Sequence, residues 1–281
     1  MSDANFNIDD VIGSLSNPYD DSTSVQGDGI PRIQWRNGEA RMRQPGYAYV
    51  AAKSCEYYKV DPPRGEGWSE VEQVFASGAA EQGYMSPAVK VIVLGIRACD
   101  IIETKADGRV INTEYLAKPV DRNNRPEGWS HMAEMLCLMS GFGNQVVNLR
   151  TKRVSASYAL LNAVRGIQQG FLNDVRQAFK NPTVPMWSFW LLLRSERDPS
   201  GKPIHRPTRG GVAVTPPGLY LPQGDVKDIA RKAFIGRDMI DLVTEYRKQY
   251  HDWLNATPGS PQTPVQPAPQ AAKKSDDDFY F

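Results

Sequence analysis

Residues 88–102 have the sequence AVKVIVLGIRACDII, a nearly continuous apolar run that is rich in β-branched residues. This composition predicts a β-strand. Gly95 within it predicts a bulge or bend, which a highly curved barrel needs. Residues 105–108 (KADG) predict a hairpin turn, after which the chain returns through residues 110–115.

The segments on either side predict further strands and helices. Ile33 and Trp35 indicate a first strand, which a tight Asn37-Gly38 turn joins to an extended stretch over residues 41–58. Residues 186–197 (MWSFWLLLRSER) predict another strand. Helical patterns cover residues 68–76, 130–139 with Ser130 as N-cap, 155–179, and 225–255 with a joint near Gly236.

In chain order, the expected elements give a β-rich α+β fold. A five-stranded barrel with a helix between its third and fourth strands is the oligonucleotide-binding (OB) fold, so we expect an elaborated, OB-like antiparallel barrel with added helices. The alternative is a helix-decorated antiparallel sheet of another α+β type. The expected domains are an acidic, mostly disordered segment over residues 1–30, an OB-like body over 31–256, and a disordered linker and tail over 257–281.

Charge is segregated along the chain. Residues 1–30 contain six aspartates and no Lys, Arg or Glu, and residues 257–281 carry a net charge of −1. Because the whole chain is +1, the body carries +8. A basic body between acidic ends is typical of nucleic-acid-binding proteins, although a basic enzyme has the same balance.

The chain ends with three carboxylates followed by three aromatic rings. Residues 257–272, rich in Pro, Gln and Ala, predict a disordered tether, because they offer too little apolar surface to offset the entropy of ordering. The tip suits a partner's apolar pocket rimmed with Lys or Arg. Its candidate partner-binding residues are Asp276, Asp277, Asp278, Phe279, Tyr280 and Phe281.

This ending resembles the C-terminal tails of bacterial and phage single-stranded DNA-binding proteins. The resemblance covers about the last 25 of the 281 residues. Bacterial tails usually end in Pro-Phe, whereas Phe279-Tyr280-Phe281 is more similar to phage endings. The resemblance implies a tail that recruits replication, recombination or repair proteins such as a polymerase, helicase or nuclease.

Two segments supply both the cations and the rings that single-strand binding requires. Trp187 and Phe189 alternate in phase with leucines and favour a core position, while Trp190 suits the core and the binding face equally. The candidate DNA-binding residues are Trp35, Arg36, Arg41, Arg43, Tyr47, Tyr49, Lys53, Tyr57 and Lys59 in the first segment, and Trp190, Arg194, Lys202, Arg206 and Arg209 in the second.

Catalytic and metal-binding motifs are weak. The chain has neither a GxxxxGK phosphate loop nor HExxH, and its three histidines are scattered. Asp100, Glu103 and Asp107 form the best carboxylate cluster, but their position at a strand end and turn suits ordinary surface acids. We therefore expect no enzyme activity, no cofactor and no metal. Three dispersed cysteines predict reduced core residues, and the sequence offers no signal peptide or apolar membrane span, so we expect a cytoplasmic protein, in the host cytoplasm if it is phage-encoded.

The leading interpretation is a non-enzymatic, largely sequence-independent single-stranded DNA-binding protein of replication, recombination or repair. One alternative is a strand-annealing recombination protein whose extra helices make subunit contacts. Others are an adaptor that binds no nucleic acid and a DNA-processing enzyme. The sequence leaves the oligomeric state open, a homo-oligomer included.

Overall fold

The computed structural model describes residues 29–38, 43–65, 67–74, 80–106, 109–116, 118–121, 123–207 and 213–255. The predicted terminal segments 1–30 and 257–281 lie outside this range, except for Gly29 and Ile30. Ile30 is fully buried in an apolar cluster with side chains of the C-terminal helices. The packed part of the chain therefore includes at least this residue before Pro31.

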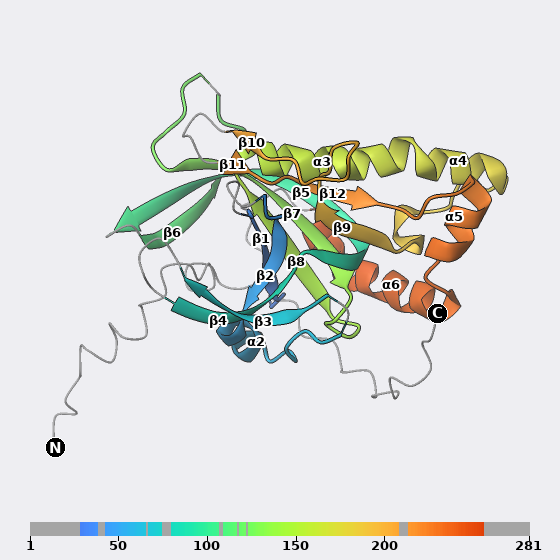
Figure 1. Cartoon of the computed structure of the whole chain (residues 1–281), viewed down its shortest axis with the longest axis horizontal. Coiled ribbons are helices and arrows are strands. Elements are labelled where there is room, and N and C mark those ends of the chain that lie inside the picture. Colours follow the sequence, from blue (N-terminus) through green and yellow to red (C-terminus); the bar gives the residue numbers. More distant parts are fainter. Residues whose placement is uncertain are drawn as a thin grey trace, which may run out of the picture.

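A ten-stranded mixed sheet forms the centre of the described part of the molecule (Figure 1). Its order is β12-β9-β5-β7-β8-β1-β2-β4-β3, and β6 pairs with β5 beside this path. A separate two-stranded sheet consists of β10 and β11. The strands are β1 (Arg32–Arg36), β2 (Tyr47–Ala51), β3 (Ser69–Val74), β4 (Ala80–Ser86), β5 (Ala88–Ala106), β6 (Arg109–Leu116), β7 (Trp129–Met139), β8 (Val146–Lys152), β9 (Leu191–Ser195), β10 (Arg206–Pro207), β11 (Ala213–Val214) and β12 (Pro217–Tyr220).

Helices cover both faces of this sheet. They are α2 (Ala52–Tyr58), α3 (Val154–Gln169), α4 (Phe171–Ala178), the 3-10 turn η2 (Met186–Ser188), α5 (Val226–Ala233), α6 (Arg237–Gln249) and α7 (His251–Asn255). The predicted helix over 155–179 is confirmed as α3 and α4, which meet at Gly170, and the predicted joint near Gly236 separates α5 from α6. None of the described helices combines the length and apolar character needed to span a membrane.

The strand predicted over residues 88–102 is confirmed as part of β5, which organises the sheet. Its first residues pair with β9, its middle with β7 and its end with β6, all antiparallel. The predicted bend at Gly95 is confirmed, because the register with β7 shifts between Val93 and Gly95. A Cβ on Gly95 would lie 2.3 Å from the side chain of Leu254, so the glycine also lets α7 approach the strand.

The prediction of a helix over residues 130–139 is wrong. These residues form β7, which pairs with β5 on one edge and with β8 on the other. Residues 132–139 are all buried, so the strand is apolar on both faces. A doubly buried strand lacks the alternation that separates a strand from a buried helix, and here tertiary pairing outweighs the helix preference of Met and Leu.

Smaller differences follow from the same local ambiguity. Residues 69–74, within the expected helix 68–76, form the strand β3. The expected extended stretch over 41–58 contains β2 and then α2, while only residues 191–195 of the expected strand 186–197 belong to β9. Strands β1 and β2 pair from Arg36 and Tyr47 inward, so a ten-residue connection replaces the expected two-residue turn at Asn37-Gly38.

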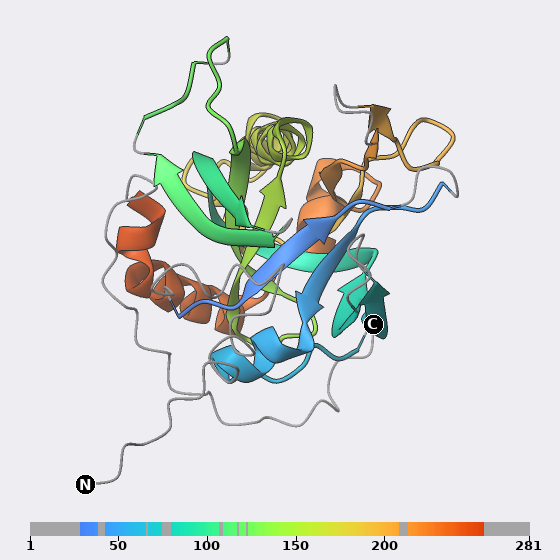
Figure 2. The same cartoon turned by 90° about the vertical axis from the view of Figure 1, so that its left-hand side faces the viewer.

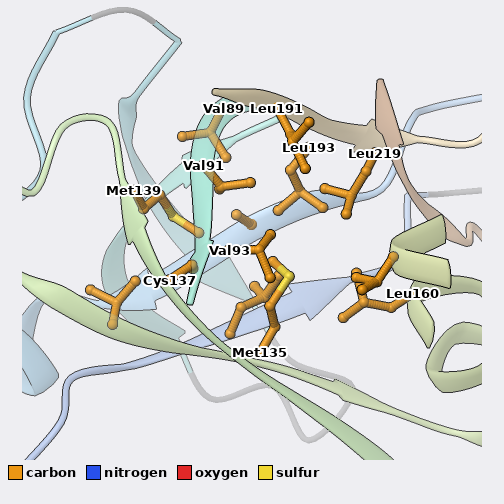
Figure 3. Close-up of a cluster of buried hydrophobic side chains, with 14 of the residues drawn as sticks. Val89, Val91, Val93, Met135, Cys137, Met139, Leu160, Leu191, Leu193 and Leu219 are labelled. Carbon is orange, nitrogen blue, oxygen red and sulfur yellow. The ribbon is translucent and has the colours of Figure 1, made fainter. Parts of the chain in front are cut away.

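Two apolar cores pack against opposite faces of the sheet. The larger one joins inward-facing residues of β1, β5, β7 and β9 to α3, α4 and α5. Figure 3 shows part of it: Val89, Val91 and Val93 of β5 lie with Leu191 and Leu193 of β9 and with Leu160 of α3. The second core places Ile92 and Leu94 of β5 against α6 and α7. Alternate residues of one strand thus face two cores, which explains its continuous apolar run.

The expected closed antiparallel barrel is not observed. The sheet is mixed, because β1 runs parallel to β8 while its other neighbours in the sheet are antiparallel. It also stays open. Among the described strands, the two end strands of the sheet do not meet, because β12 pairs with β9 alone and β3 with β4 alone.

Candidate nucleic-acid interface

Hydrogen bonds join the two segments that the sequence singles out. The backbone N–H of Gly46 donates to Ser195 Oγ at 2.6 Å, and Ser195 Oγ lies 3.2 Å from the carbonyl oxygen of Gly46. The connection between β1 and β2 therefore contacts the end of β9, 149 residues away in the chain. We call the region formed by residues 35–38, 46, 195 and 215 the junction.

Thr215, between β11 and β12, supplies the other half of the junction. Its hydroxyl accepts the N–H of Gly38 at 3.0 Å, and its own N–H donates to Asn37 Oδ1 at 3.0 Å. Its carbonyl accepts the indole N–H of Trp35 at 2.8 Å. Because Ser195 and Thr215 are almost completely buried, these bonds lie out of water and fix the two connections side by side.

Gly46 is required by this close approach. A Cβ at that position would lie 2.5 Å from Thr215 Oγ1 and 2.9 Å from the carbonyl oxygen of Arg36. Contacts below 3.0 Å do not occur for real Cβ atoms, and one of them is to backbone. A larger residue would therefore push the two connections apart.

The two segments that meet at the junction are rich in cations. Residues 194–212 contain five Arg or Lys against two carboxylates, and residues 36–46 contain three Arg against one Glu. Arg43, Arg197, Lys202 and Arg206 are exposed, while Arg36 and Arg194 are half-buried. Arg206 forms an ion pair with Glu196, and Arg197 donates to the carbonyl of Gly201 at 2.6 Å.

A strip of outward-facing residues on β5, β9 and β12 extends this cationic surface. Arg194 lies opposite both Ala88 and Gly218, and the next outward row holds Lys90, Leu192 and Tyr220. The guanidinium of Arg194 lies over the Tyr220 ring, 4.5 Å from its centroid. Cross-strand neighbours on one face are in direct reach, so two cations and a ring share one small area.

Tyr220 and Lys90 are absent from the residues predicted from sequence. Tyr220 is half-buried, and its hydroxyl accepts the backbone N–H of Arg197 at 3.3 Å. Its short strand begins at the second of two prolines, so it has too few residues for an alternation that would have revealed its face. The available signal was Lys90 itself, a cation in an otherwise apolar stretch of the sequence.

Tyr47 and Tyr49 are the two rings that β2 contributes to the first segment, and both are already engaged. The guanidinium of Arg36 lies 5.2 Å from the centroid of the Tyr49 ring, whose hydroxyl donates to Glu81 at 3.0 Å. Tyr47 donates to Gln73 at 2.8 Å. Burial raises the pKa of both phenols, and Glu81 raises that of Tyr49 further. Tyr49 is only 2% exposed and so is a packing residue, whereas Tyr47 is half-buried.

The two predicted tryptophans do not lie on an open surface. Trp35 is 7% exposed and belongs to the larger core, and its indole N–H donates to the carbonyl of Thr215. Trp190 packs partly buried against the second core, and its backbone N–H donates to Ala233 at 2.7 Å. The prediction that Trp35 stacks on bases is therefore corrected, because alternation along a strand cannot tell which face a helix will cover. Trp190 is half-buried, and its place on the binding face stays a prediction.

Three other predicted residues lie on α2, at the opposite end of β2 from the junction (Figure 1). Lys53 forms an ion pair with Glu81 at 3.0 Å. Tyr57 is 59% exposed and contacts Tyr58 edge-on, while Lys59 ends the helix with a φ of 54°. The structure does not bring them together with Arg194 and Arg206.

The remaining predicted residues lie outside the described part of the chain. They are Arg41 and Arg209, together with the partner-binding residues Asp276, Asp277, Asp278, Phe279, Tyr280 and Phe281.

A buried ion cluster lies between β5, β7 and β8. Glu134 of β7 is fully buried, with Arg97 Nη2 at 2.7 Å and Arg150 Nη2 at 2.8 Å. Asn148 and Tyr115 also donate to its carboxylate. Burial alone would raise the pKa of Glu134, but the two guanidiniums outweigh it and hold the pKa below its usual value. Ionised Glu134 thus joins three strands.

Within the described residues, no group of three or more His, Cys, Asp or Glu side chains is placed to hold a metal ion. The strand-end acids Asp100 and Glu103 are each engaged locally. Asp100 Oδ1 lies 2.6 Å from His131 Nδ1, and Glu103 accepts Lys152 Nζ at 2.7 Å.

No protein family, curated protein or solved structure matches this chain. The features of this chain that bear on its function are therefore the junction and the strip of Lys90, Arg194 and Tyr220.

Proposed function

We propose that this protein binds single-stranded DNA without catalysing a reaction and acts in replication, recombination or repair. The observation that carries the proposal is the junction, because it holds two cationic connections together next to the Arg194–Tyr220 pair. Single-strand binding without sequence preference needs cations along the backbone and rings against the bases. The strip of Lys90, Arg194 and Tyr220 offers both within three adjacent strands.

We further propose that part of the sheet is an open, rearranged OB-like unit. Leaving aside β6, which pairs only with β5, strands β5, β7 and β8 follow one another in the chain and pair antiparallel, α3 and α4 follow, and β9 returns to pair with the start of β5. This is the order of a strand triplet, a helix and a fourth strand that the OB fold has. The strand beside β8 is supplied by β1, from the beginning of the chain, instead of by a fifth strand after β9.

Titration of labelled oligo(dT) at two salt concentrations tests the binding, with Arg206→Ala as the variant and Arg231→Ala as its control. Both arginines are exposed and paired with a carboxylate, but Arg231 lies on α5. We expect the wild type to prefer the single strand over duplex, and Arg206→Ala to lower the salt slope by about 1 while Arg231→Ala leaves it unchanged. Equal slopes for both variants, or no binding at low salt, would contradict the proposal.

The tail is proposed to recruit a polymerase, helicase or nuclease, on the strength of its sequence alone. Removal of residues 275–281 should keep or raise the affinity for oligo(dT), because three aspartates no longer compete with phosphates for the basic body. The same deletion should abolish partner binding. Weaker DNA binding after the deletion would count against this role.

A further inference from the structure

Two loops flank the N-terminal end of α3. In Figure 2 this end of the helix faces the viewer, with the green connection from β6 to β7 on one side and the orange β10–β11 ribbon on the other. The second of these belongs to the cationic region beside the junction. We call the first, residues 118–128 as far as they are described, the arm-base loop, because it lies at the base of the β5–β6 hairpin.

The arm-base loop carries a cation on a ring. The guanidinium of Arg125 lies 4.6 Å from the centroid of the Trp129 ring. Arg125 is exposed and Trp129 is half-buried at the start of β7. The backbone N–H of Trp129 donates to the carbonyl of Pro126 at 3.2 Å, which fixes the turn between the two side chains. The pair thus repeats, at a second place, the chemistry of Arg194 and Tyr220.

Asp100 and His131 connect this loop to the sheet and to α3. Asp100 Oδ2 accepts the N–H of Val120 at 2.7 Å, while its other oxygen lies 2.6 Å from the His131 ring. That ring stacks on Tyr158 of α3, with 4.9 Å between centroids and 16° between planes. The hydroxyl of Ser157 donates to the carbonyl of His131 at 3.0 Å. The loop is therefore held against the first turns of the helix.

The N-terminal end of α3 is suited to a phosphate. No side chain caps this 16-residue helix, and its first turn contains no acidic residue. Arg153, immediately before it, is exposed. The N-terminal end of a helix has partial positive charge and backbone donors, so it attracts anions. Here it lies between the Arg125–Trp129 pair and the β10–β11 ribbon, which carries Arg206.

We propose that a single strand bound at the junction continues across the N-terminal end of α3 to a second base-binding site formed by Arg125 and Trp129. A nucleobase stacks there on the Trp129 ring or on the guanidinium above it, while Arg153 and the end of α3 contact the phosphates between the two sites. This inference rests on the proposed function and adds a second, separate contact to it.

The length of the oligonucleotide separates the two sites. Oligo(dT) of about 5 nucleotides is near the smallest site of a single OB fold, so we expect it to occupy the junction alone, whereas about 20 nucleotides exceeds the range of a single OB-type site. We expect Trp129→Ala to weaken binding of the long oligonucleotide about tenfold, the loss of one stacked base, and to leave the short one unchanged. Arg125→Ala should weaken the long one less, with a salt slope lower by about 1.

Arg231→Ala is the matched control, and thermal unfolding of each variant checks that it is folded. If Trp129→Ala fails to fold, Arg125→Ala, an exposed substitution, decides alone. Binding of both lengths by the wild type, with unchanged affinity and salt slope for the folded variants, would overturn the second site and leave the proposed function standing. Failure of the wild type to bind either length would overturn the proposed function and this inference with it.

Discussion

Ser195 Oγ accepts the N–H of Gly46 at 2.6 Å and lies 3.2 Å from the carbonyl of the same residue. One hydroxyl thus satisfies a buried donor and a buried acceptor that belong to a distant part of the chain. Gly46 lies outside the strands, so these two hydrogen bonds connect the β1–β2 loop to the end of β9 without a ladder of strand pairing.

Ser195→Ala should destabilise the protein by about 1–3 kcal/mol, because it leaves two buried backbone groups without their partner. Urea unfolding measures the change. Ser200→Ala is the control, since Ser200 bonds Asp198 in an exposed turn and its loss should cost less than about 0.5 kcal/mol. Equal midpoints for the two variants would show that the junction adds nothing to stability.

Gly46→Ala and Gly166→Ala should change stability in opposite directions. The new Cβ at residue 46 would meet Thr215 Oγ1 at 2.5 Å, and relieving such overpacking costs about 1–3 kcal/mol. Gly166 lies inside α3 with nothing within 4 Å of a new Cβ, so alanine there should stabilise by about 0.5–1 kcal/mol. Thermal unfolding of both variants tests this, and a stabilising Gly46→Ala would refute the close approach.

Glu134→Gln should cost about 3–5 kcal/mol, because it leaves two largely buried guanidiniums without their carboxylate. The pKa of Glu134 is lowered in the folded protein from an ordinary value of 4.5. Its ionised form therefore stabilises the fold fully above pH 4.5, and this contribution is lost as the pH falls through the lower folded-state pKa.

Urea unfolding of the wild type and of Glu134→Gln between pH 7 and pH 3 measures both effects. The difference between the two proteins should shrink as the pH falls below 4.5. Asp228→Asn is the control, because it breaks an exposed ion pair with Arg231 and should cost less than about 1 kcal/mol. A difference that does not vary with pH would contradict the assignment.

The three cysteines should be inert in the folded protein. Cys55, Cys99 and Cys137 are buried and free, as the sequence predicts. Burial raises the pKa of Cys55 to about 11 and that of Cys99 to about 12, and a nearby carboxylate adds to both shifts. Burial alone raises the pKa of Cys137. At pH 8 a thiol-specific disulfide reagent should label them at least about a hundredfold more slowly than in urea. Fast labelling of one thiol would reveal local opening around it.

Elements with a local signal could be predicted from the sequence. Strand β5 and the bend at Gly95 follow from an apolar run interrupted by one glycine. The start of α5 follows from Asp225, whose side chain accepts the N–H groups of Lys227 and Asp228. In each case neighbouring residues alone determine the conformation.

Strand β7 and the open sheet could not be predicted in this way. The all-apolar residues of β7 carry no period, so the sequence does not separate a buried helix from a central strand. Whether a barrel closes depends on which strand takes the last free edge, and β12 takes the edge of β9. That pairing is a property of the whole chain.

The sequence predicted which segments supply cations and rings to the candidate site, but not which of these side chains face outward. Arg194 and Arg206 were predicted from a cation-rich segment, and the structure has the first over a ring and the second in an exposed ion pair. Trp35 carries the same sequence signal but points inward, because its strand faces the larger core at that position. Whether a side chain on a strand is exposed depends on which elements pack on that face of the sheet, and the neighbouring sequence does not show this.

The parallel pairing of β1 with β8 has a consequence for synthesis and folding. Residues 32–34 pair with residues 148–150, so β1 meets β8, and β2, β4 and β3 join the rest of the sheet through it, only after more than one hundred residues beyond β1 have been made. Such distant pairings slow folding, because closing a long loop costs entropy before the contacts that offset this cost have formed. While the ribosome is still making β8, β1 presents an unpaired edge, which is the kind of surface that aggregates or engages chaperones. We therefore expect the nascent N-terminal third to need protection until residue 152 has emerged.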